Sequence, residues 1–301
     1  MGRKHLYIIG LSSLLSISLI WYFFIKKNDY SISFKVKAAP GTVFYGIQAW
    51  SATQQGNVSV LKKKNFNFIE QEIENGYVDL VYCWNIQSVN DSVSKVNVGI
   101  KDLNNSFYNR ITLPFFNTSF KTEQVGNVKA VKEALEEHIK NFKIKIDGVG
   151  KSEETFVAYI NLKCSLEKKA QAMMKNDAII TGFLHSNSIR ITGRPYVEIN
   201  HWDQDNELLD FNYCFPINKA TKMIVDEQVK FKTLASVKGL QATYWGNFMT
   251  SDRAWFALLD YAKRHGYNLT NKPLEHFLAN PFDGGDELTW EAKIIIPFAL
   301  K

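Results

Sequence analysis

The sequence predicts an α+β protein made of three consecutive parts. These are an N-terminal transmembrane helix, a strand meander packed on one long helix, and a pseudo-twofold domain built from a duplicated strand–helix–strand–strand unit. Three observations predict this fold class. The 301-residue chain has an uncharged apolar run near its start, its middle alternates in polarity up to one long amphipathic segment, and its last part repeats one order of elements.

The first apolar run is predicted to be a membrane anchor. Leu6–Ile25 is a 20-residue stretch without a charge or a proline, and a helix of that length spans roughly the 30 Å hydrocarbon core. Trp21 and Tyr22 fall where an interfacial aromatic belt is expected. A cleaved secretory signal is the alternative, but no small-x-small cleavage site precedes Lys26–Lys27. The flanking charges give a slight preference for a single-pass protein whose body is extracytoplasmic.

The net charge and the cysteines exclude several classes of protein. Of the 36 basic residues, Arg3, Lys4, Lys26 and Lys27 bracket the apolar run, which leaves 32 against 30 acidic residues in the rest of the chain. The net charge of +6 therefore does not describe a phosphate-binding surface, and we expect no nucleic acid partner. The three cysteines are widely spaced and form no CxxC pair, so neither a disulfide scaffold nor a zinc ribbon is expected.

The meander is predicted from alternating strands and a closing helix. Tyr30–Ala38 alternates as a half-buried strand does, and Thr42–Trp50 reads as a short helix after the Pro–Gly break. The strands expected next are Val58–Lys63, Phe66–Glu74, Tyr77–Gln87, Ser92–Lys101 and Phe107–Phe115. Asn75–Gly76 is typical of a two-residue hairpin turn. Ser119–Phe142 is predicted to be one long helix, because its apolar residues recur at three- and four-residue steps.

The opening of this region carries a resemblance. Val36–Lys37–Ala38–Ala39–Pro40–Gly41–Thr42–Val43–Phe44 ends a strand and begins a helix. Together with the long closing helix, it resembles the START-like (SRPBCC, polyketide cyclase-like) helix-grip domains, although Ser51–Gly56 stands where that family has a tryptophan-rich loop. The resemblance implies a lipid-accommodating apolar cavity between sheet and helix. The residues leave open whether that space is a cavity or a filled core.

The second half contains an internal repeat. The first copy has a strand, a helix and two strands at Thr155–Cys164, Leu166–Thr181, Pro195–Trp202 and Leu209–Ile217. The second copy has them at Phe231–Tyr244, Ser251–Arg264, Leu274–Ala279 and Thr289–Ala299. Each copy ends in an apolar–Pro–apolar triplet, so a pseudo-twofold domain with one shared sheet is expected. His265–Gly266 should end the second helix, with the glycine at C′.

The repeat region carries a second resemblance. Its motifs are Gly193–Arg194–Pro195–Tyr196, His201–Trp202–Asp203, Phe211–Ile217, Gly239–Gly246, the helix with Trp255, Leu258 and Tyr261, Glu275–His276–Phe277, Asn280–Pro281 and Trp290–Phe298. In their order and spacing they resemble the GyrI-like effector-binding domain, which also occurs fused to AraC-type and MerR-type regulators. The resemblance implies a groove between the two helices that binds small organic molecules, often aromatic or cationic.

A groove for a cation needs ring faces and a carboxylate, because together they replace the water that the cation loses. The predicted ligand-binding residues are Tyr159, Tyr196, Glu198, Trp202, Tyr244, Trp245, Trp255, Glu291 and Lys293. The alternative is that the aromatic members are core residues. In the family, a glutamate four residues before the closing proline contacts the effector, and Lys293 occupies that position here. Lys293 then pairs with Glu291 or Glu198, or the groove accepts an anion.

These observations predict a membrane-anchored protein that binds a small molecule as a sensor, a carrier or a sequestering protein. Its expected parts are an anchor at 1–27, a START-like domain at 28–147 and a GyrI-like domain at 148–301. One alternative is a weak hydrolase that uses the same groove, and another is a non-catalytic structural partner of a membrane complex. No nucleophile or phosphate-loop motif is present, and His and Cys never fall at metal-ligand spacing. We therefore predict no catalytic residue, no metal and no cofactor, while ligand identity and oligomeric state stay undefined.

Overall fold

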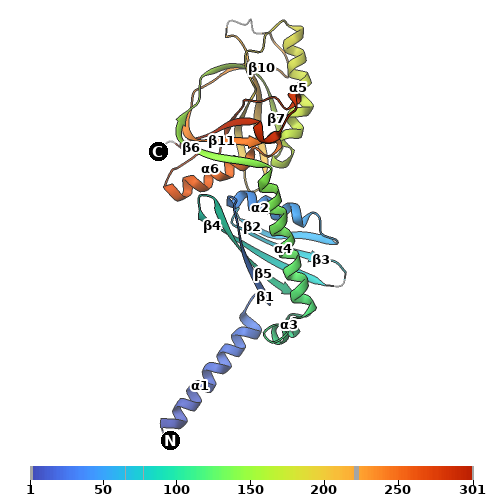
Figure 1. The fold of residues 1–301 in the computed structure, drawn as a ribbon, viewed down its shortest axis with the longest axis vertical. Helices are drawn as coiled ribbons and strands as arrows, with labels where there is room; N and C mark the ends of the chain where they lie inside the picture. The colour runs from blue at the N-terminus through green and yellow to red at the C-terminus, as the bar shows by residue number, and fades with distance from the viewer. Residues whose placement is uncertain (1–2, 65, 77, 220–223, 300–301) are drawn as a thin grey trace. The chain divides into compact units, whose positions relative to one another are not determined.

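The computed structural model describes residues 3–64, 66–76, 78–219 and 224–299, and the chain forms two compact units (Figure 1). The first unit comprises Met1–Val36, Phe44–Gln87 and Lys95–Ala134. The second comprises Lys37–Val43, Ser88–Ser94 and Leu135–Lys301. Tyr77, where one strand was expected to begin, lies outside the described residues.

The N-terminal helix differs from the predicted anchor. Helix α1 covers Arg3–Ile20, which includes two basic residues and four serines, and the backbone continues as a π-helical turn over Trp21–Ile25. Among the described residues, no helix combines the length and the apolar character that a membrane crossing requires. The predicted transmembrane helix at Leu6–Ile25 is therefore wrong, as are the fold class that began with it and the single-pass membrane localisation.

The first unit contains a five-stranded sheet with the order β1-β5-β4-β3-β2. Its strands are β1 (Tyr30–Val36), β2 (Asn57–Lys64), β3 (Phe68–Glu74), β4 (Asp79–Asn90) and β5 (Val93–Asp102). Helices α2 (Pro40–Ser51), α3 (Ser106–Thr112) and α4 (Ser119–Lys140) complete this part of the chain. Alternate residues of β4 are buried, among them Tyr82 and Trp84, whose rings stack at 5.8 Å. Burial raises the pKa of Tyr82 to about 12, and its hydroxyl bonds Gln124 of α4.

Residues Ser106–Thr112 form helix α3, so the strand predicted at Phe107–Phe115 is wrong. The carboxylate of Asp102 accepts hydrogen bonds from the backbone N–H groups of Asn104 and Asn105 at 2.9 and 2.8 Å. These contacts form the turn that leads into the helix, since Asn104 and Asn105 immediately precede its first residue, Ser106. The aromatic and β-branched residues of this segment suggested a strand, but after this polar turn the chain continues as a helix.

Arg110 of α3 holds the end of the π-helical turn. It is buried, and its Nε donates to Asp29 Oδ1 at 2.7 Å. Its other nitrogens donate to the carbonyl oxygens of Tyr22, Phe23 and Lys26, at 3.1, 2.7 and 2.6 Å. One guanidinium therefore satisfies three carbonyls around the turn and a buried carboxylate.

The second unit contains an eight-stranded sheet with the order β10-β7-β9-β8-β12-β13-β11-β6 (Figure 1). Its strands are β6 (Phe142–Lys151), β7 (Thr155–Ser165), β8 (Tyr196–Asp203), β9 (Leu208–Pro216), β10 (Lys230–Leu234), β11 (Lys238–Gly246), β12 (Leu274–Phe277) and β13 (Glu291–Pro297). The order is a mirror image about the antiparallel β8–β12 pair, with β7-β9-β8 on one side and β12-β13-β11 on the other. The single strand expected at Phe231–Tyr244 is two strands, β10 and β11, and the edge strand β6 was not foreseen.

Two helices belong to this sheet in equivalent positions of the two copies. Helix α5 (Lys169–Ser186) follows β7, and α6 (Asp252–His265) follows β11 and a short turn at Phe248–Thr250. Gly266 ends α6 with φ 75°, in the left-handed conformation that favours glycine.

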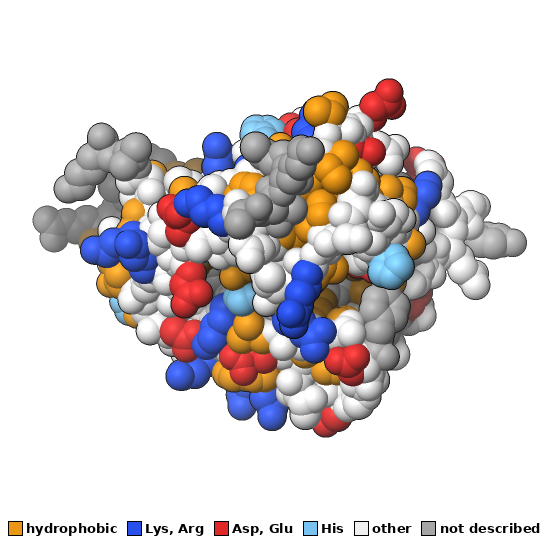
Figure 2. Space-filling view, turned by 90° about the horizontal axis from the view of Figure 1, so that it is seen from above, with side chains coloured by type: hydrophobic (Ala, Val, Ile, Leu, Met, Phe, Trp, Pro, Cys, Tyr) orange, Lys and Arg blue, Asp and Glu red, His pale blue; other side chains and the backbone are white. Residues whose placement is uncertain are grey.

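On the face shown in Figure 2, acidic and basic side chains are interspersed among hydrophobic ones.

Successive side chains of each strand point to opposite sides, so the sheet has two distinct faces. Tyr213 and Glu275 reach side chains of α5 and α6, so they mark the helix face. The opposite face carries a buried apolar cluster that consists of Val157, Tyr196, Cys214, Leu234, Leu274 and Ile295. Each face has a cavity next to it, as described below.

Candidate functional site

The larger cavity has a volume of about 510 Å³ and lies on the helix face of the second unit. Side chains from α5, β9, the turn before α6, β12 and the residue before β13 line it. They include Met173, Met174, Asp177, Tyr213, Phe215, Phe248, Met249, Phe277 and Trp290. The wall is therefore mostly aromatic rings and thioethers, which adapt to ligands of varied shape.

One side of the cavity is a single face of α5. Ala170, Met173, Met174, Asp177 and Thr181 all line it, and they are separated by the three- and four-residue steps that bring helical side chains together. Met173 is buried and Asp177 is half-buried. The apolar residues of this helix face thus surround one carboxylate.

A sharp turn positions the opposite wall. Gly246 has φ 149°, and a Cβ there would lie 2.6 Å from the Tyr244 hydroxyl, so only glycine fits. Next, the Asn247 side chain accepts a hydrogen bond from the backbone N–H of Met249 at 2.9 Å. This cap directs Phe248 into the wall, where its ring stacks on Phe277 with centroids 4.5 Å apart.

The cavity wall contains one acidic and one basic side chain, Asp177 and Arg194, in different surroundings. Tyr213 Oη donates to Asp177 Oδ1 at 2.8 Å, and burial together with this neighbouring carboxylate raises the pKa of Tyr213. Arg194 also lines the cavity, but it is exposed and forms an ion pair with Asp283 at 3.3 Å. Among the described lining residues, Asp177 is the acidic one. The interior is therefore suited to a positive charge.

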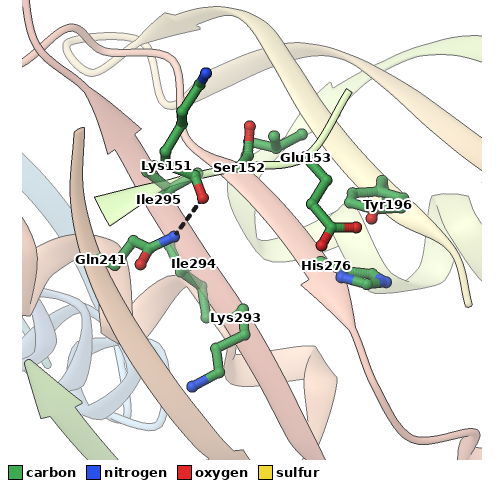
Figure 3. A pocket seen from close by; sticks show the side chains of 10 residues that line it. Lys151, Ser152, Glu153, Tyr196, Gln241, His276, Lys293, Ile294 and Ile295 are labelled. Carbon is green, nitrogen blue, oxygen red and sulfur yellow. Dashed lines mark hydrogen bonds between the residues drawn. The ribbon is translucent and has the colours of Figure 1, made fainter. Parts of the chain in front are cut away.

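A smaller cavity of about 210 Å³ lies on the opposite face, and Figure 3 shows its lining. Two of the predicted ligand-binding residues, Tyr196 and Lys293, line it. The Tyr196 ring stacks on His276, with centroids 3.9 Å apart and planes 7° from parallel. Burial lowers the pKa of His276, against a smaller opposing effect of Glu153. The cavity thus combines a neutral ring stack with charged residues at its edge.

Lys293 pairs with Glu291, which is one of the two partners that the sequence predicts for this lysine. Its Nζ lies 3.6 Å from both Glu291 and Asp147 and donates to Thr243 Oγ1 at 2.5 Å. Glu291 and Asp147, the second of which also pairs with Lys145 at 3.4 Å, therefore lie next to its charge, which argues against an anion site at this lysine.

The other predicted residues of this face lie in two separate places on the sheet. Glu198 pairs with Lys232, whose Nζ lies 4.9 Å from the centroid of the Tyr159 ring. Trp245 lies opposite Glu291 in the β11–β13 register. These residues line neither of the two cavities described.

Trp202, Tyr244 and Trp255 lie in the core of the second unit, with 2%, 0% and 0% of their surface exposed. The Trp202 and Trp255 rings meet edge to face at 5.3 Å, and Tyr244 Oη donates to the Asn247 carbonyl at 2.8 Å. None of the nine predicted residues lines the larger cavity. The structure brings there instead Met173, Asp177, Tyr213, Phe248 and Trp290, which sequence reasoning missed.

No family model and no curated protein matches the chain. Among solved structures it is similar to the EcmrR C-terminal domain, with a TM-score of 0.45 and 15% identity over 53% of this chain and 99% of that one. SAV2435 bound to tetraphenylphosphonium has a TM-score of 0.37 and 12% identity, over 52% and 94%. A hydrolase encoded by lin2189 from Listeria innocua has a TM-score of 0.34 and 11% identity, over 53% and 92%. The neighbours include GyrI-like and MerR-type effector-binding domains, at an identity too low to assign a family to this chain.

Proposed function

We propose that the second unit binds a small, mainly apolar organic cation in the larger cavity. The observation that carries this proposal is the Asp177 carboxylate, held by Tyr213 within a wall of rings and methionines. Such a wall removes water from a ligand, and the carboxylate then stabilises a positive charge more strongly than it would in water. The volume of about 510 Å³ suits a ligand of drug-like size.

The ring geometry supports an aromatic ligand. Phe248 stacks on Phe277, and the Trp290 ring lies 6.0 Å from Phe248 at 53°. Tyr213 and Phe215 meet edge to face at 5.1 Å. The rings therefore present both faces and edges, the two arrangements that aromatic partners prefer. Sensing, carrying and sequestering all need this binding step, and the proposal concerns the step itself.

Two ions of the same shape and opposite charge test the proposal. Tetraphenylphosphonium, the ligand in the SAV2435 structure, and tetraphenylborate each carry four phenyl rings on one central atom. Thermal denaturation of the full-length chain would be followed with each ion. A ligand at 100 times its Kd adds about 2.7 kcal/mol of stability. We expect the phosphonium to raise the Tm and the borate to leave it unchanged; no shift, or equal shifts, would contradict the proposal.

A further inference from the structure

A second carboxylate on the helix face is fully enclosed by the protein's own side chains. Glu275 of β12 is 0% exposed, and Lys169 at the start of α5 is 1% exposed. Lys169 Nζ lies 3.0 and 2.9 Å from the two carboxylate oxygens of Glu275. It also donates to Ser251 Oγ at 2.9 Å and lies 4.4 Å from the centroid of the Trp255 ring.

The surroundings of this ammonium group are those of a ligand site. A primary ammonium has three donors, and here they meet two carboxylate oxygens and one hydroxyl. The Trp255 face adds a cation–π contact, while its Nε1 donates to Glu275 Oε1 at 2.8 Å and orients the carboxylate. A carboxylate, a ring face and a hydroxyl therefore form a cage around one cation.

A buried ion pair is weak evidence for a role in stability. Apolar side chains in place of a buried ion pair are often neutral or stabilising, because two charges must be taken out of water. The cage also adjoins the larger cavity. Ala170 and Phe277 line that cavity, the first next to Lys169 in the chain and the second on the same face of β12 as Glu275. Without the Lys169 ammonium, the cavity would border a second buried negative charge.

We propose that Lys169 is an internal cation that fills a primary-ammonium site formed by Glu275, Trp255 and Ser251. By filling it, Lys169 withholds Glu275 from ligands and leaves Asp177 as the acid that faces the larger cavity. This inference goes beyond the proposed function, because it assigns a second cation site and a specificity-determining residue. The chemical class that this site takes is a primary alkylammonium.

Truncation of the Lys169 side chain by mutation tests whether the site accepts a primary ammonium. Lys169→Ala removes three carbons and the nitrogen, which are the heavy atoms of n-propylammonium. We expect n-propylammonium chloride to raise the Tm of full-length Lys169→Ala in a saturable way. Equal concentrations of n-propanol and of sodium chloride should not, because the first lacks the charge and the second lacks the shape. Wild-type protein and Lys169→Ala/Glu275→Gln should show no specific rise.

Two results would overturn the proposal. One is an equal response of Lys169→Ala to n-propanol, and the other is an equal response of the double variant to n-propylammonium. If Lys169→Ala does not stay folded, its refolding yield with each additive gives the same comparison, and Lys169→Met/Glu275→Met serves as the uncharged control. The test is separate from that of the proposed function, since tetraphenylphosphonium should stabilise wild-type protein whether or not Lys169→Ala accepts an amine.

Discussion

Tyr213 Oη donates a hydrogen bond to Asp177 Oδ1 at 2.8 Å and so joins strand β9 to helix α5 in the wall of the larger cavity. Burial and the carboxylate raise the pKa of Tyr213, which keeps its hydroxyl protonated at ordinary pH. The hydroxyl can therefore act only as the donor towards Asp177. This one contact fixes the direction of the charged group that the proposed ligand would meet.

Tyr213→Phe should lower the free energy of unfolding by about 1 kcal/mol, because it removes one hydrogen bond and keeps the ring. Urea denaturation of the full-length chain measures the change. Asp205→Asn, which alters an exposed carboxylate outside the cavity, is the control and should unfold like wild type. An unchanged midpoint for Tyr213→Phe would show that the bond has no energetic weight.

Phe248→Ala should cost about 3–5 kcal/mol of stability, because it removes a large core ring and leaves a void. Phe248 is buried and stacks on Phe277, so its loss also removes an aromatic wall of the cavity. Phe248→Leu keeps most of the volume and should retain more stability. The two variants would be compared by urea denaturation; equal midpoints for both would contradict a packing role for the ring.

His276 should make stability depend on pH. Burial lowers its pKa below the ordinary value of 6.5, so the folded protein binds this proton less readily than the unfolded chain. The stability due to His276 is therefore fully present above about pH 6.5 and is lost as the pH falls through the lower folded pKa. His276→Phe keeps the stack on Tyr196 and should flatten the curve below pH 6.5. A variant with the same slope as wild type would refute this assignment.

Arg110→Ala should destabilise the first unit by about 3–5 kcal/mol, because it leaves the buried Asp29 carboxylate without its cation. It also frees the carbonyls around the Trp21–Ile25 turn, so trypsin should cut faster at Lys26 and Lys27. Urea denaturation and timed proteolysis measure the two effects. Lys140→Ala, which breaks an exposed ion pair with Glu137, should change neither. Similar cleavage rates for both variants would contradict the anchoring role of Arg110.

The sequence predicted those elements whose structure is set by residues a few positions apart in the chain. The apolar steps of Ser119–Phe142 predicted α4, which covers Ser119–Lys140. Gly266 adopts the left-handed conformation expected of a C′ residue. The pattern failed at Phe107–Phe115, where the Asp102 turn leads into a helix that the Arg110 contacts hold. Asp29, the partner of Arg110, is distant in the sequence but close in space, and alternation cannot register such a contact.

The candidate site could be predicted only in part, for the same reason. The spacing of Ala170, Met173 and Asp177 marks one helix face, and that much can be read from the sequence. The sequence does not say that Phe248 and Trp290 close the other side, since pairing of β11 with β13 brings them there. It also suggested Trp255 as a ligand contact, whereas its ring lies against the internal cation Lys169.

The role of Asp177 is measured most directly by isothermal titration calorimetry of tetraphenylphosphonium with the full-length wild-type chain, Asp177→Asn and the control Asp205→Asn. We expect wild type and Asp205→Asn to bind alike and Asp177→Asn to bind about tenfold more weakly, which corresponds to about 1.4 kcal/mol. Equal affinity in all three proteins would contradict a cation site at Asp177.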